Sequence, residues 1–168
     1  INKSSIKNKQ LEVITHSTDK KFISLKNKKK IILFVGRLNK SKGYDIFGNS
    51  ITKLLNKFPS WTAVVIGDEP REKHIFKHKN LKILGFQKYN IVSKYFKAAD
   101  ISVVCSRWNE PFGRTALEAS SCGCAVIITN RGGLPEAAPY AIKINKLNSR
   151  NLENNISKLM KNIKFRKN

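Results

Sequence analysis

The residues best suited to chemistry lie close together, within positions 107–119. This segment contains two carboxylates eight positions apart, Glu110 and Glu118, and Pro111 and Gly113 stand beside the first of them. Proline and glycine end the apolar run before them, and the residues after Gly113 are typical of a helix start. The spacing therefore predicts one carboxylate in a loop and the other on the helix that follows it.

The start of this predicted helix is suited to bind a phosphate. Backbone N–H groups near Phe112, Gly113 and Arg114 have no acceptor within the helix, and the helix dipole adds positive potential there. Two carboxylates beside such a site would accept hydrogen bonds from hydroxyls at both ends of a nucleotide sugar. The alternative for Glu118 is an ion pair with Arg114 one turn earlier. The alternative for Glu110 is a solvated loop acid.

Arg37 and Lys42 form a second candidate pair, in a segment that follows another apolar run. A planar guanidinium and an ammonium both suit a diphosphate. The segment lacks the Gly-x4-Gly-Lys-Ser/Thr pattern of a P-loop, and the chain has no Gly-x-Gly-x-x-Gly dinucleotide fingerprint. An isolated lysine near a glycine is otherwise an ordinary surface residue in a chain with 33 Lys and Arg.

Short apolar runs alternate with helical periods along most of the chain. The runs are rich in β-branched residues and apolar on both faces, as in buried parallel strands: 31–35, 62–66, 81–84, 101–105, 125–128 and, more weakly, 140–144. Helical periods occupy about 44–57, 90–98, 114–122 and 149–163. This alternation predicts an α/β fold, a Rossmann-like three-layer α/β/α domain with a parallel sheet of about six strands.

The segments that follow the first five predicted strands all contain glycine. They lie at the carboxyl ends of parallel strands, where open α/β sheets bind ligands. The candidate residues above fall in these segments, and so does the Gly85-Phe86 pair. We expect one domain at 30–168, preceded by a polar connector at 1–29.

Composition narrows the functional classes. The chain has 168 residues and a formal net charge of +22, with lysines spread along its whole length. Aromatic residues do not alternate with the basic ones, which disfavours nucleic acid as a partner. An anionic membrane surface or phosphorylated ligands suit the charge better. The odd number of cysteines fits no disulfide framework and favours the cytoplasm.

Several further residues have simple structural interpretations. His74 and His78 stand four positions apart, on one face of a predicted helix, as surface residues. Cys122 and Cys124 lead into a strand and lack the further ligands of a zinc site. Trp61 and Trp108 are most simply packing residues, although Trp108 is close enough to Glu110 to line a site.

In their order and spacing, seven segments resemble the carboxyl-terminal, donor-binding domain of retaining glycosyltransferases of the "group 1" family, which is one half of a GT-B fold. The resemblance runs from about Val13 to Leu159, and its segments are 33–38, 42–43, 65–68, 98–101, 110–118, 122–127 and 132–136. The Glu-x7-Glu block of Glu110 and Glu118 is the most distinctive of them.

The resemblance implies a role for each candidate residue. Arg37 and Lys42 correspond to the diphosphate-binding pair, and Glu110 to the catalytic acid that holds donor-sugar hydroxyls. Backbone amides at 112–114 would meet sugar and phosphate, and Glu118 would bind the ribose. For the side chain of Arg114 we favour the ion pair with Glu118 over a phosphate contact. The loop of Gly85 and Phe86 would form the wall around the nucleobase.

The resemblance also implies a metal-independent enzyme without a cofactor, in which the nucleotide-diphosphate sugar is the substrate. Consistent with this, the chain has no Asp-x-Asp pair. The acceptor would bind to an amino-terminal half that this chain does not contain, in cell-surface glycan or polysaccharide synthesis. We therefore expect a cytoplasmic domain fragment, peripheral to the inner membrane, that is inactive alone. The alternatives are half of a sugar-nucleotide 2-epimerase and a non-enzymatic module that binds RNA or anionic membrane.

Overall fold

The computed structural model describes residues 28–167. The predicted connector 1–29 lies outside this range up to residue 27. The strands are β1 (Lys29–Val35), β2 (Thr62–Ile66), β3 (Leu81–Ile83), β4 (Ala99–Val104), β5 (Ala125–Thr129) and β6 (Ile142–Ile144). The helices are α1 (Tyr44–Lys57), α2 (Tyr89–Ala98), α3 (Arg114–Ser121), α4 (Leu134–Ala137), α5 (Ser149–Lys161) and α6 (Ile163–Lys167), with a 3-10 turn, η1 (Lys40–Lys42), before α1.

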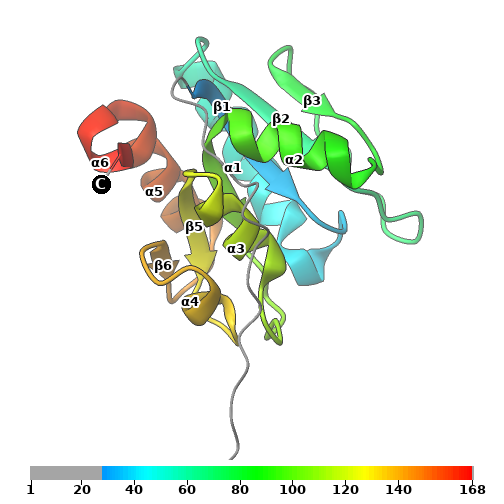
Figure 1. The fold of residues 1–168 in the computed structure, drawn as a ribbon. Helices are drawn as coiled ribbons and strands as arrows, with labels where there is room; N and C mark the ends of the chain where they lie inside the picture. Colours follow the sequence, from blue (N-terminus) through cyan, green and yellow to red (C-terminus); the bar gives the residue numbers. More distant parts are fainter. Residues whose placement is uncertain (1–27, 168) are drawn as a thin grey trace, which may run out of the picture.

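The six strands form one parallel sheet in the order β3-β2-β1-β4-β5-β6 (Figure 1). Leu33 in the middle of β1 pairs with Val64 on one side and Ser102 on the other. The chain builds outward from β1 through β2 to β3, and then crosses back to place β4 on the other side of β1. The strand order therefore reverses between β1 and β4, and such a switch point is where open α/β sheets bind ligands.

Two apolar clusters cover the two faces of the sheet. Successive residues of a strand point to opposite faces, so Phe34 belongs to one cluster and Leu33 to the other. The Phe34 side packs against α1 and α5, with Phe47 and Ile156 fully buried. The Leu33 side packs against α2, α3 and α4. This arrangement confirms the predicted three-layer α/β/α domain.

The structure differs from the sequence-based expectations in its short elements. The turns α4, α6 and η1 were not predicted, because three to five residues are too few to show a helical period. The helix expected to carry His74 and His78 is wrong, since residues 67–80 form an extended loop before β3. In that loop His74 Nε2 lies 2.7 Å from a Glu72 oxygen, and His78 Nε2 lies 3.2 Å from Asn56 Oδ1. Within residues 28–167, none of the helices has the length and apolarity needed to cross a membrane.

Candidate functional site

A cavity of about 300 Å³ opens at the switch point between β1 and β4. Residues after β1 form one wall, and the segment from the end of β4 to the start of α3 forms the other. The glycines and polar residues in its lining are Gly36, Lys42, Ser106, Glu110, Gly113, Arg114 and Thr115. The carboxyl ends of the two central strands therefore bring together segments that are about 70 positions apart in the sequence.

Lys42 and Glu110 form an ion pair across this cavity. Their side chains are only 24% and 16% exposed, so both charges lie largely out of bulk water. A second cavity of about 480 Å³ adjoins this pair, and it is also lined by Arg37 and Trp108. The structure thus brings the predicted diphosphate pair and the predicted sugar-binding acid to one place.

The turn η1 holds the backbone of Lys42 in place. The Asn39 side chain caps this turn by accepting a hydrogen bond from the Lys42 N–H at 3.1 Å. Gly43 ends the turn with a φ of 75°, a left-handed conformation that favours glycine. A Cβ at Gly43 would also lie 2.0 Å from the carbonyl oxygen of Cys105. Glycine therefore permits the close approach of this turn to the end of β4.

The loop that carries Glu110 rests on the loop after β5. The Gly133 N–H donates to the Glu110 carbonyl at 2.7 Å. The neighbouring Gly132 has a φ of 52°, and a Cβ there would lie 2.3 Å from the same carbonyl oxygen. The Thr129 hydroxyl donates to the Ser106 carbonyl at 2.6 Å, at the start of the same loop. Two glycines and a buried threonine thus fix the backbone on which Glu110 stands.

Helix α3 begins at the cavity wall. Phe112, Gly113, Arg114 and Thr115 all line the cavity, so the positive end of the helix dipole lies at this wall. Among these residues Gly113 is the N-cap, and its carbonyl already accepts hydrogen bonds from Ala116 and Leu117. The predicted phosphate-facing segment is therefore part of the same cavity as Lys42 and Glu110.

Glu118 lies one turn further along α3 and does not line these two cavities. Its side chain is 15% exposed, and burial raises the pKa of its carboxyl, while the charge of Arg114 acts in the opposite direction. The Arg114 guanidinium lies 3.7 Å from the Glu118 carboxylate, as the favoured alternative predicted. Arg114 itself is 77% exposed, so this pair contributes only a few tenths of a kcal/mol.

The remaining predicted residues, Gly85 and Phe86, follow β3 at the same end of the sheet. Gly85 lines a third cavity of about 360 Å³, together with Leu38 and the loop after β2. Its carbonyl accepts a hydrogen bond from Gly67 at 2.8 Å, which joins the two loops. The Phe86 side chain is 76% exposed and does not line the three cavities described here.

The two tryptophans have different environments. Trp61 is 3% exposed and packs in the core, which confirms its predicted packing role. Trp108 is 61% exposed and lines the cavity beside Arg37, so it is not a packing residue. All three cysteines are buried and free, and burial raises the pKa of Cys105 and Cys124 to about 12. In the described part of the chain, no group of three or more His, Cys, Asp or Glu residues could hold a metal ion.

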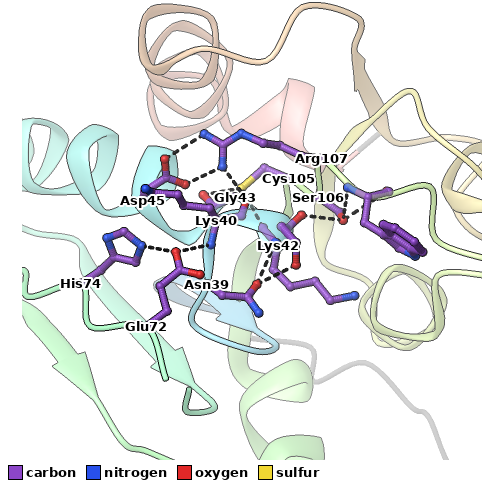
Figure 2. Close-up of polar contacts among 12 residues, drawn as sticks. Asn39, Lys40, Lys42, Gly43, Asp45, Glu72, His74, Cys105, Ser106 and Arg107 are labelled. Carbon is purple, nitrogen blue, oxygen red and sulfur yellow. Dashed lines mark hydrogen bonds and ion pairs between the residues drawn. The ribbon is translucent and has the colours of Figure 1, made fainter. Parts of the chain in front are cut away.

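Sequence reasoning missed one prominent contact beside the site. Arg107 in the loop after β4 reaches Asp45 in the first turn of α1, with N–O distances of 2.6 and 2.8 Å (Figure 2). The sequence predicted no separate role for Arg107 within the segment 107–119, and none for Asp45. A basic residue and an acidic residue 62 positions apart carry no signal in a single sequence, because their contact depends on the strand order.

Comparisons with known proteins agree on one family. The family model described as "Glycosyl transferases group 1" matches residues 16–168. The putative glycosyltransferase YtcC of Bacillus subtilis is 31% identical over an alignment of 128 positions that covers 68% of this chain and 31% of that protein. The lipopolysaccharide core biosynthesis mannosyltransferase LpsB of Rhizobium meliloti is 32% identical over an alignment of 128 positions that covers 70% of this chain and 36% of that protein. The chain thus spans about a third of the length of the curated relatives it matches.

Solved structures resemble the fold as well. The C-terminal domain of a group 1 family glycosyl transferase (LpcC) from Francisella tularensis aligns with a TM-score of 0.72 and 30% identity, covering 84% of this chain and 80% of that domain. Anabaena HepE in complex with UDP-glucose aligns with a TM-score of 0.69 and 22% identity, covering 83% of this chain and 41% of HepE. This chain therefore belongs to the glycosyl transferases group 1 family, and its fold is that of the carboxyl-terminal domain of these GT-B enzymes.

Proposed function

We propose that this chain binds the nucleotide-diphosphate-sugar donor of a retaining, metal-independent glycosyltransferase. The observation that carries the proposal is the cavity at the β1–β4 switch point, where Lys42 faces Glu110 beside the start of α3. A donor of this class joins a highly charged diphosphate to an uncharged, hydroxyl-rich sugar. A site with a cation, a carboxylate and a helix start offers a partner for each part.

Lys42 and Arg37 would bind the diphosphate, together with backbone amides at residues 112–114. Glu110 would accept hydrogen bonds from the donor-sugar hydroxyls. Without a donor, Lys42 and Glu110 neutralise each other. A bound donor would separate these roles, because phosphate oxygens attract the ammonium and sugar hydroxyls donate to the carboxylate.

Glu118 would bind the ribose hydroxyls, and the loop of Gly85 and Phe86 would face the nucleobase. For Glu118 the support is the Glu-x7-Glu spacing, and for the nucleobase loop it is the order of the loops along the sheet edge. The 300 Å³ cavity lies between β1 and β4, and the 360 Å³ cavity lies at the loops after β2 and β3. A nucleotide sugar could therefore extend across neighbouring strand ends, with its diphosphate in the middle.

In the transfer reaction, the bond between the anomeric carbon and a diphosphate oxygen breaks, and its electron pair stays on the diphosphate. The acceptor oxygen bonds to the anomeric carbon, and its proton passes to the oxygen of the leaving diphosphate. Arg37, Lys42 and the positive end of α3 would stabilise the charge that develops on the leaving diphosphate. Cations held by the protein would thereby supply the electrostatic role that a metal ion has in other enzymes.

The acceptor would bind to a second half of the protein, so that the two halves meet around the anomeric carbon and exclude water. The relatives matched here are about three times as long as the matched segment. The matched mannosyltransferase LpsB acts in lipopolysaccharide core biosynthesis, which supports a role in cell-surface glycan synthesis. A net charge of +22 suits peripheral contact with the anionic cytoplasmic face of a membrane.

The test is binding and turnover against a panel of UDP-, GDP- and ADP-sugars. Saturation-transfer NMR on the 168-residue chain should identify one preferred nucleotide sugar, and the preference should survive EDTA. Arg37→Ala and Lys42→Ala should each weaken the matching nucleoside diphosphate far more than the monophosphate. Equal losses for both ligands, or binding that requires a divalent ion, would contradict the proposed site. Nucleotide release in the presence of an acceptor mixture should be absent for this chain, and robust release would favour a self-sufficient enzyme of another class.

A further inference from the structure

We propose that Arg107 is a positioning residue for diphosphate binding, acting through Lys42, and that Asp45 is its partner. This inference rests on the proposed function, because it assigns the group that holds the phosphate-binding lysine in place. Arg107 lies on the loop after β4, three positions before Glu110, and its guanidinium reaches Asp45 of α1 (Figure 2). Arg107 does not line either of the two cavities beside Lys42 and Glu110.

The Arg107 guanidinium connects its own loop to α1 and to η1. Two of its nitrogens donate to the two oxygens of Asp45, at 2.6 and 2.8 Å. One of them also donates to the carbonyl of Lys40 in η1. Burial alone would raise the pKa of Asp45, but the hydrogen bonds and charge of Arg107, together with backbone N–H groups of α1, hold that pKa below its ordinary value. The contact is therefore between two full charges at neutral pH.

The backbone continues the same contact. The N–H groups of Arg107 and Trp108 donate to the Ser41 carbonyl at 2.7 and 3.2 Å. The Ser106 hydroxyl donates to the same oxygen at 3.1 Å. The Cys105 thiol lies 3.4 Å from the Gly43 carbonyl. Carbonyl oxygens on both sides of Lys42 thus face the segment that follows β4.

Lys42 is at the centre of this arrangement. Its backbone belongs to the turn that Arg107 holds, and its ammonium reaches Glu110, on the loop that carries Arg107. The Arg107–Asp45 contact therefore closes a ring that fixes the distance between the two charged groups of the cavity. Binding groups must be held within a fraction of an ångström to be effective, which is the role we assign to Arg107.

A direct role for Arg107 as a phosphate ligand is a different mechanism, and variants separate the two. Arg107→Lys keeps the positive charge but cannot bond both Asp45 oxygens and the Lys40 carbonyl at once. Asp45→Asn removes the charge of the partner and one of its two acceptor oxygens, and leaves the guanidinium its bond to the Lys40 carbonyl. If Arg107 positions Lys42, both variants weaken diphosphate binding. If Arg107 contacts phosphate or acts by its charge alone, Asp45→Asn retains diphosphate binding because the guanidinium is still present, and that result would overturn the proposal.

The experiment measures the affinity ratio of nucleoside diphosphate to monophosphate by calorimetry, using whichever of UDP, GDP and ADP binds the 168-residue chain most tightly. Arg107→Met should reduce this ratio about tenfold or more, the range for a hydrogen-bonded charge. Lys42→Met should have a similar effect, and the double variant should add little to it. Lys53→Met is the matched control, since it removes a cation that pairs with Glu153 at 3.2 Å elsewhere on α1.

Four outcomes are informative. A ratio reduced in Arg107→Met and not reduced further in the double variant supports positioning through Lys42. Equal losses for both ligands, additive with Lys42→Met, would mean general destabilisation and would overturn the inference. A diphosphate preference kept by Arg107→Met would overturn it as well, while a wild-type chain without any such preference would instead contradict the proposed function on which it rests.

Discussion

The Lys42 ammonium and the Glu110 carboxylate form an ion pair although 68 positions separate them. The pair exists because β1 and β4 are neighbours in the sheet, so the segments after them meet at the switch point. Both side chains are mostly buried, and without a ligand each charge has the other as its partner. A ligand that occupies this cavity must offer both charges a better partner, which a phosphorylated sugar does.

Glu110→Gln should separate the two halves of donor recognition. Loss of the carboxylate frees Lys42 for phosphate, so the affinity for a nucleoside diphosphate should be unchanged or increased. The extra affinity of the nucleotide sugar over the diphosphate should fall, because the amide replaces an ionised acceptor by a neutral one. Trp108 fluorescence can report both titrations in a Trp61→Phe background, where it is the single remaining tryptophan. A loss of diphosphate affinity in Glu110→Gln would contradict the assigned roles.

Glu118→Gln tests the ribose assignment together with the cost of a buried carboxylate. Nucleotide affinity should fall by about 1–3 kcal/mol, the range for a charged hydrogen bond. Burial raises the pKa of Glu118, so its ionised form destabilises the fold as the pH rises through that pKa. The variant should therefore be at least as stable as wild type at pH 7, and wild type should gain relative to it as the pH falls toward 4. Calorimetry and urea unfolding measure the two effects, and unchanged affinity would contradict the ribose role.

Asp45→Asn should show the opposite dependence on pH. The pKa of Asp45 is lowered in the folded chain, so its ion pair stabilises the fold above the ordinary aspartate pKa of about 4 and is lost below it. We expect the free energy of unfolding of the variant to be lower by only about 1 kcal/mol at pH 7, since both side chains of the pair are partly exposed. Urea unfolding at several pH values should find the difference shrinking below about pH 4. A difference that is constant with pH would exclude the charge as its cause.

Gly43→Ala and Gly85→Ala form a matched pair of variants. Both glycines have positive φ values, 75° and 67°, so alanine is strained at each of them. A Cβ at Gly43 would lie 2.0 Å from the Cys105 carbonyl oxygen, whereas nothing lies within 4 Å of one at Gly85. Backbone strain alone should lower the free energy of unfolding of Gly85→Ala by about 1 kcal/mol, and that of Gly43→Ala should fall clearly more. Equal losses in thermal unfolding would mean that η1 can move away from the end of β4.

Much of the fold could be predicted from the sequence, because the long elements have clear periods. The strand at Thr62–Ile66 and the helix at Tyr44–Lys57 have the predicted bounds, since apolar residues recur there at the spacing of a buried strand or an amphipathic helix. The loop that contains His74 was predicted as a helix only because His74 and His78 are four positions apart. In the structure the polar groups of this loop bond partly to one another and partly to η1, since Glu72 contacts His74 and accepts the Lys40 N–H.

The candidate site was predictable as a set of loops but not as a geometry. Glycines after successive strands place their loops at one edge of a parallel sheet, and that inference requires no knowledge of the strand order. The pairing of Lys42 with Glu110 and of Arg107 with Asp45 requires the order β1-β4, which a single sequence does not contain. For Trp108 the sequence allowed both packing and a place in the lining of the site, and the structure decides for the second, because Trp108 is exposed beside Arg37 and Glu110.

The central claim is that a nucleotide-diphosphate sugar binds at the carboxyl ends of β1 and β4. The most direct measurement is a titration of the ¹⁵N-labelled chain with the preferred nucleotide sugar, followed by amide chemical shifts at low and moderate salt. We expect shifts concentrated at Gly36, Lys42 and residues 110–115, with affinity largely retained at moderate salt. Shifts scattered over surface lysines, with binding that collapses as salt rises, would contradict it and indicate a non-specific attraction to phosphate.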